Sequence, residues 1–240
     1  MGRPVTAARG ESDVTACARL ARLIWQPGLH MDAGWWTTFE MSGWRAPYLR
    51  HAACRPPVDR LLVERRGWPL AGRTNCTLAR SEAALVMLHL IPNLRRVALA
   101  YGLRVLGCPD YLLLGTFRRA LSPWLDAWQC DRLLLTRQEW PSHRAFEADE
   151  LATAAMATTG EQLDAICTAR TSPGTSDTSG VPDDPVATID DVATVHMAMR
   201  ILLPPPGLTA AAAGGNPVMD DIWPRLAALE KMLCMSSTTH

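Results

Sequence analysis

The sequence predicts a mostly α-helical protein, an irregular multi-helix bundle with a disordered loop near residues 171–185. Apolar residues recur at steps of three and four in several segments, which is typical of helices that bury one face. Prolines, glycines and capping residues separate these segments, and the alternating patterns of half-buried strands are scarce. The short polar breaks between the predicted helices favour antiparallel neighbours in a bundle.

The N-terminal part predicts two helices on either side of an aromatic segment. Residues 1–15 are small and polar, and we expect them to be frayed. Residues 14–25 have helical apolar spacing that stops before Pro27, and residues 58–64 follow a Pro-Pro pair that suits a first helical turn. Between these helices, four aromatic residues crowd a short segment: Trp35, Trp36, Phe39 and Trp44.

The centre of the chain predicts two consecutive helices. Ser81 is placed to cap the first, which runs to Ile91, and Pro92 begins the second, which continues to Leu106. Gly107 is a typical C-terminal stop. Apolar residues of the second helix recur on one face: Leu94, Val97, Ala98, Tyr101 and Val105.

Two more helices are expected before residue 136. Asp110 is placed to cap one of them, and Ser122 followed by Pro123 is a typical start for the other. Helical phase predicts that their apolar residues face the core: Leu113, Leu114, Phe117 and Leu121 in the first, and Trp124, Leu125, Trp128 and residues 133–135 in the second.

The remaining third predicts helices over residues 149–169, 190–202 and 222–235. Residues 171–185 are rich in Ser, Thr, Gly, Pro and Asp, so they offer little apolar area to offset the entropy of ordering. Residues 1–150 hold 20 arginines against 14 acidic residues, whereas residues 151–240 hold 4 basic residues against 10 acidic ones. We therefore expect an Arg- and Trp-rich helical body (1–150) and a more acidic helical part (151–240), either as two parts or as one domain.

Composition excludes several functions. Basic and acidic residues number 24 each, and this balance argues against binding to nucleic acid or anionic lipid by bulk electrostatics. The apolar stretch 83–94 is too short to span a membrane, and 201–219 is interrupted by prolines and glycines, so no direct insertion into membranes is predicted. Lys231 is the single lysine, which excludes a P-loop and Schiff-base chemistry, and no Gly-rich dinucleotide motif is present, so no cofactor is predicted. No apolar run resembles a signal-peptide core, and we expect a soluble, cytoplasmic protein.

Cysteine and histidine provide only weak candidates for chemistry. The seven cysteines are evenly spread without a CxxC pair, which predicts free thiols in a reducing compartment. His51 and Cys54 form one HxxC pair, but zinc needs three or four ligands, so no metal site is predicted. Cys130 with His143 would be the dyad of a Cys/His-based hydrolase, a small soluble enzyme that we keep as the alternative function.

Arginine pairs are the best candidates for partner binding. Three pairs stand on separate predicted helices, and two of them lie in the central part: Arg95 with Arg96, and Arg118 with Arg119. If such pairs meet on one face they can grip a partner's anionic groups. The alternative is that each pair is a solvated face or is paired with nearby carboxylates.

Two segments carry a family resemblance. Residues 94–128 (LRRVALAYGLRVLGCPDYLLLGTFRRALSPWLDAW) resemble the middle of the SctK family, the cytosolic accessory proteins of bacterial type III secretion. Residues 192–208 (VATVHMAMRILLPPPGL), followed by Trp223, are similar to that family's C-terminal part. The resemblance implies a non-enzymatic adaptor of the cytosolic sorting platform, peripheral to the inner membrane. Its implied partners are the cytoplasmic domain of the inner-membrane ring and the pod protein of the platform.

Overall fold

Every regular element in the described part of the chain is a helix. The computed structural model describes residues 6–68, 81–136, 139–140, 142–171, 191–207 and 222–234. These residues form α1 (Thr6–Trp25), η1 (Pro27–Leu29), α2 (Ala33–Thr38), α3 (Ser42–Arg50), η2 (Ala52–Cys54), α4 (Arg55–Arg65), α5 (Glu82–Leu90), η3 (Ile91–Asn93), α6 (Leu94–Leu106), α7 (Asp110–Leu113), α8 (Gly115–Leu121), α9 (Ala127–Leu135), α10 (Ala148–Thr171), α11 (Asp191–Met199), η4 (Arg200–Leu202) and α12 (Ile222–Cys234). The predicted all-helical fold is confirmed over these ranges.

Local signals set several helix ends as predicted. The Ser81 hydroxyl accepts a hydrogen bond from the Ala84 amide (3.2 Å), which caps α5. Pro92 lies in the single 3-10 turn that joins α5 to α6. Gly107 ends α6 in the left-handed conformation, with φ of 66°, which glycine adopts without steric cost.

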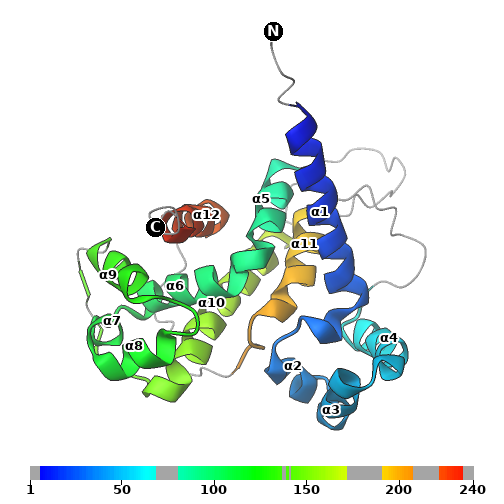
Figure 1. Cartoon of the computed structure of the whole chain (residues 1–240), viewed down its shortest axis with the longest axis horizontal. Helices are drawn as coiled ribbons and strands as arrows, with labels where there is room; N and C mark the ends of the chain where they lie inside the picture. The colour runs from blue at the N-terminus through cyan, green and yellow to red at the C-terminus, as the bar shows by residue number, and fades with distance from the viewer. Residues whose placement is uncertain are drawn as a thin grey trace, which may run out of the picture.

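The helices form three neighbouring groups (Figure 1). The helices α1, α5 and α11 pack against one another, and the short helices α2, α3 and α4 lie at one end of the molecule. The helices α7, α8 and α9 lie at the other end. The long helix α10 packs along α6 through the middle, and α12 covers α5 and α6. The α6–α10 pair therefore connects the two ends.

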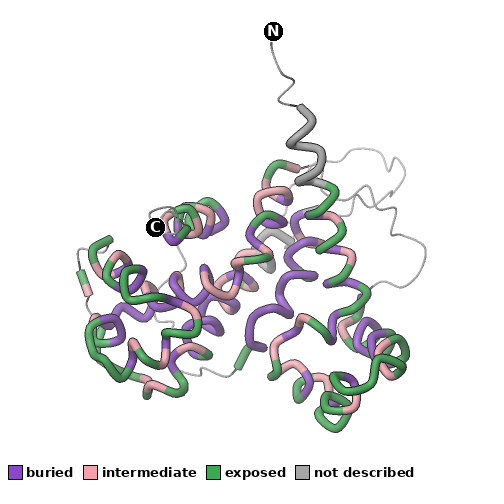
Figure 2. The backbone as a smooth tube through the Cα atoms, viewed as in Figure 1, coloured by how far each residue is buried: buried purple, intermediate pink, exposed green. Residues whose placement is uncertain are grey.

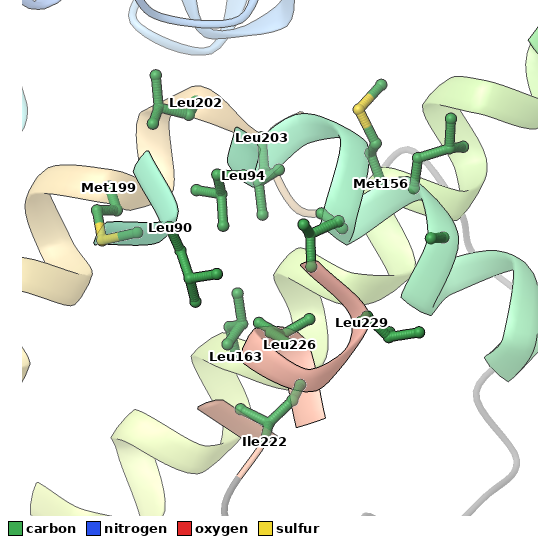
Figure 3. Close-up of a cluster of buried hydrophobic side chains, with 14 of the residues drawn as sticks. Leu90, Leu94, Met156, Leu163, Met199, Leu202, Leu203, Ile222, Leu226 and Leu229 are labelled. Carbon is green, nitrogen blue, oxygen red and sulfur yellow. The ribbon is translucent and has the colours of Figure 1, made fainter. Parts of the chain in front are cut away.

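One hydrophobic core holds these groups together. Figure 3 shows Leu90 and Leu94 facing Leu163 of α10, with Leu226 of α12 closing the cluster. Buried residues from η4 and the end of α11 reach the same core. Residues from both sides of position 150 therefore share one apolar interior. Figure 2 shows this distribution, with buried backbone along α6, α10 and α11 and much exposed surface on α3, α4 and α9.

The backbones of α6 and α10 approach each other closely at Gly102. A Cβ at this position would lie 1.9 Å from the carbonyl oxygen of Ala155 and 2.9 Å from its Cα, so only glycine fits. One turn away, the buried Thr159 hydroxyl donates to the Ala98 carbonyl oxygen (2.7 Å). These two contacts define where the two helices cross.

A second, smaller core lies under α2, α3 and α4. It contains Trp36, Tyr48, Leu62 and Ile201, together with Met31, Met41 and Val58. At its edge the buried Asp59 carboxylate accepts hydrogen bonds from the Tyr48 hydroxyl (2.9 Å) and the Gly28 amide (3.1 Å). Burial raises the pKa of Asp59, which these hydrogen bonds partly oppose. This network fixes η1 against α4.

The predicted helix that Asp110 begins is in fact two helices. Leu114 adopts an extended conformation (φ −78°, ψ 134°), which ends α7 and lets Gly115 begin α8 in a new direction. Phe117 and Leu121 are buried as predicted. Leu113 and Leu114 face solvent with 53% and 42% of their surface exposed, so their predicted inward orientation is wrong.

The next helix begins later than predicted, and this reverses the role of Trp128. Asp126 and Gln129 form a capping box at the start of α9, whereas Ser122 and Pro123 lie in the preceding turn. In this phase Leu133 is buried, Leu135 is 84% exposed, and Trp128 is 44% exposed beneath the Arg132 guanidinium. Trp128 was predicted to face the core, and that prediction is wrong.

Several other predictions concern the ends of elements. The helix α1 begins at Thr6, within the segment 1–15 that was predicted to be frayed, and residues 1–5 lie outside the described residues. The predicted loop 171–185 lies outside the described residues after Thr171.

Among the described residues, the continuous helical stretch 82–106 is long and apolar enough to cross a membrane by length and composition. Half of its most apolar window is buried in the protein, and core helices of soluble proteins pass the same test.

Substituting Gly102 with alanine should destabilise the protein by about 3 kcal/mol or more, because the new methyl group collides with helix backbone rather than with a movable side chain. Gly115→Ala is the matched control, since nothing lies within 4 Å of its Cβ position, and it should leave stability unchanged or slightly higher. Urea unfolding followed by circular dichroism measures both. Equal midpoints for the two variants would contradict the close α6–α10 crossing.

Trp128→Ala should lower the free energy of unfolding by less than about 1 kcal/mol, because the side chain is half-exposed and packs against the Arg132 guanidinium at the surface. Leu133→Ala, in the same helix but fully buried, should cost about 2–5 kcal/mol. Thermal unfolding of the two variants distinguishes outward from inward orientation. A larger loss for Trp128→Ala than for Leu133→Ala would contradict the observed phase of α9.

Candidate functional site

A basic hollow lies where α1, η1 and the start of α6 meet the turn after α8. It has a volume of about 570 Å³, and we call it the arginine groove. Its lining contains no carboxylate among the described residues. Its polar lining consists of Arg19, Arg22, His30, Asn93, Arg95 and Arg96, and its apolar lining includes Leu29, Trp124 and Leu202.

The sequence of α1 places two of these arginines. Arg19 and Arg22 are one turn apart and therefore share a face of the helix. Leu20 and Leu23 are buried against the core, which turns both arginines toward solvent. Neither guanidinium forms an ion pair with a carboxylate in the described part of the chain.

The start of α6 provides the other two arginines. Arg95 donates from Nε to the Leu202 carbonyl oxygen and from Nη2 to the His30 carbonyl oxygen, each at 2.8 Å. It therefore joins α6 to η4 and to the end of η1, while its charge stays beside the groove. Arg96 is partly buried and forms no ion pair with a described carboxylate. Arg95 is thus a structural link, and Arg96 remains available to a partner.

The positive potential of the groove acts on His30. Burial lowers the pKa of its imidazole first, and the charges of Arg22 and Arg95 lower that pKa further. Because the pKa lies below the ordinary 6.5, His30 is neutral at pH 7. The arginines therefore carry the positive charge of this site at neutral pH.

The second predicted pair lies elsewhere. Arg118 donates to the Leu112 carbonyl oxygen and pairs with Asp131, so it links α8 to α7 and α9. Arg119 is exposed on α8. Neither residue lines the arginine groove. The structure therefore brings Arg95 and Arg96 together with α1, and it places Arg118 and Arg119 outside that hollow.

A second hollow adjoins the groove at Leu29. It has a volume of about 610 Å³, and we call it the Trp25 hollow. Trp25 and Leu29 line it with 41% and 42% of their surface exposed, and Ala52 and Pro56 add apolar area. Because Leu29 lines both hollows, the basic and apolar surfaces are continuous.

The alternative enzymatic site lacks support. Cys130 is 1% exposed, and burial raises the pKa of its thiol, the opposite of what a thiolate nucleophile requires. His143 is exposed. In the part of the chain that the structure describes, no group of three metal-ligating side chains includes His51 and Cys54. The described cysteines are free thiols, whereas Cys76 and the side chain of Cys167 lie outside the description.

Sequence reasoning found half of the arginine groove. Arg95 and Arg96 stand out as adjacent cations, but Arg19 and Arg22 are separated by two residues. Their signal was the i, i+3 spacing on a helix whose other face is apolar. That α1 would lie beside the start of α6 depends on tertiary packing.

Comparison with known proteins identifies one family. The family model T3SS_LEE_assoc, described as a type III secretion system subunit, matches residues 18–172. This range runs from α1 through α10 and contains all four arginines of the groove. No curated protein and no solved structure matches the chain.

The titration of His30 tests the electrostatics of the groove. Arg22→Ala should raise the pKa of His30, because removing a nearby cation favours the protonated imidazole. Proton NMR titration measures this pKa, and the spectrum of His30→Gln assigns the signal. Arg45→Ala, exposed on α3, is the control and should leave the pKa unchanged.

The same shift has a consequence for stability. Folding lowers the pKa of His30, so the contribution of neutral His30 to the free energy of unfolding is fully present above pH 6.5. That contribution is lost as the pH falls below 6.5, because the unfolded chain then binds the proton more readily. Arg22→Ala should weaken this pH dependence. An unchanged His30 pKa in Arg22→Ala would show that the groove arginines do not act on this residue.

Proposed function

The chain belongs to the T3SS_LEE_assoc family of type III secretion system subunits, and we propose that it is a non-enzymatic adaptor of the cytosolic sorting platform. In this role it joins the cytoplasmic domain of the inner-membrane ring to the pod protein of the platform. It works in the cytoplasm, held near the inner membrane by these protein partners. The family match over residues 18–172 is the observation that carries the proposal.

The resemblance to the SctK family makes the proposal more specific. Residues 94–128, which carry that resemblance, lie inside the matched range and form α6, α7, α8 and the start of α9. Residues 192–208 lie beyond it, where α11 and η4 complete the core. The resemblance therefore extends the assignment from a secretion subunit to a platform adaptor.

The distribution of exposed arginine and tryptophan supports an adaptor with two contact surfaces. One surface combines the arginine groove with the exposed Trp25. The other lies on α8 and α9, where Arg119, Trp128 and Leu135 are exposed. Tryptophan and arginine are enriched among residues that dominate binding energy at interfaces. Two surfaces of this kind suit a protein that holds two partners at once.

Co-purification of the tagged chain from its own host tests this function. We expect both the inner-membrane ring component and the pod protein to be retained, and retention to fall with rising salt because exposed charges are screened over about 8–10 Å. Arg96→Glu and Arg119→Glu, made separately, should each weaken retention of one component about tenfold. Arg45→Glu, exposed on α3, is the matched control.

Reversal of Arg95 or Arg118 has a different expected result. Both side chains donate hydrogen bonds to backbone carbonyl oxygens, so reversing either charge should lower the melting temperature of the protein. Any loss of partner retention in these variants would follow from this lower stability. If neither component is retained by the unmodified chain, the adaptor function is wrong.

A further inference from the structure

One surface of the molecule joins two hollows with different chemistry. Arg19, Arg22 and Trp25 follow one another at steps of three along α1, and Leu29 of η1 continues the row. Leu29 lines both the arginine groove and the Trp25 hollow. The surface is thus basic at one end, and at the other it is mostly apolar with Arg55 and Arg60 also in its lining.

The basic end has charges that the described part of the chain does not neutralise. In the described part of the chain, Arg19, Arg22 and Arg96 form no ion pair, and the groove lining contains no carboxylate. Asp59 lines the neighbouring hollow, but it is buried and is hydrogen-bonded to Tyr48 and Gly28. Burial, and after it the charges of Arg22 and Arg95, lower the pKa of His30 beside this groove.

The apolar end distinguishes a protein partner from nucleic acid or lipid headgroups. Trp25 and Leu29 each leave about two-fifths of their surface exposed beside Ala52 and Pro56. Phosphate groups engage arginines but contribute nothing to the burial of this apolar area. A polypeptide segment with both carboxylates and a large apolar side chain complements both ends.

We infer that the arginine groove and the Trp25 hollow together bind an acidic segment of a partner protein. Its carboxylates lie against Arg19, Arg22 and Arg96, and one large apolar side chain packs on Trp25 and Leu29. This inference rests on the proposed adaptor function, for which it specifies the chemistry of one partner. Arg95 acts as a positioning residue, because its bonds to His30 and Leu202 fix the groove wall.

Site-specific photo-crosslinking in the full chain tests this inference. The probe is p-benzoyl-phenylalanine, an apolar photoreactive residue, placed at Leu29 where the two hollows meet and, in a second variant, at Trp25. After irradiation in the protein's own host, mass spectrometry identifies the crosslinked peptide. We expect a partner segment with an excess of Asp and Glu and at least one large apolar residue.

Charge-reversal variants show whether the arginines hold this segment. Combining Arg22→Glu with Arg96→Glu should reduce the crosslink yield at least tenfold, whereas Arg45→Glu should not. Changing the carboxylates of the identified segment to lysine should restore the crosslink to the reversed groove. Melting temperatures of the variants verify that they remain folded, and having two probe positions keeps the test valid if one variant does not fold.

The possible failures are distinguishable. A crosslink to a second copy of the chain, to nucleic acid or lipid, or to a segment without acidic residues overturns the inference. So does the absence of any crosslink from both positions while the secretion components still co-purify, and in that case the adaptor function stands. Failure to retain those components overturns the adaptor function, whatever the crosslink shows.

Discussion

The near-contact of two helix backbones at Gly102 is the constraint on which the other contacts depend. It allows α6 and α10 to approach until Thr159 reaches the Ala98 carbonyl oxygen, and the remaining helices pack on this pair. The first turn of α6 carries Arg95 and Arg96, so its position also determines where the arginine groove lies relative to α1. A residue with no side chain thus governs a charged surface two turns away.

Several arginine side chains link separate segments of this molecule through hydrogen bonds and ion pairs. Arg200 pairs with Asp164 (2.8 Å) and donates to the Pro204 carbonyl oxygen (2.6 Å), while Arg66 donates to carbonyl oxygens of α1 and α11. A planar guanidinium can satisfy several acceptors at once, which lysine cannot do in the same geometry. This explains how a protein with 24 basic residues and one lysine uses many of its charges inside the fold. Arg19 and Arg22 of the groove differ because they are exposed to solvent.

Local chemistry determined what the sequence could predict. Helix ends at Ser81, Pro92 and Gly107 follow from caps and breakers that act within a few residues, and they were predicted. The outward direction of Trp128 was missed because helical phase groups apolar residues without saying which group meets the core. Residues 94–128 pointed to the secretion family, and Arg95 and Arg96 to the site. The complete groove was not predictable, because it requires α1 to lie beside α6, more than 70 residues later.

The two late helices have a consequence for how the protein is made. Leu226 of α12 and Val195 of α11 complete the core around α5 and α6, yet both follow the family-matched range. A ribosome adding about 5–20 residues per second needs several seconds to go from the end of α10 to the end of α12. During that interval the apolar faces of Leu90 and Leu94 are open to water and to other nascent chains. The emerging polypeptide therefore exposes this apolar surface until α12 closes the interior.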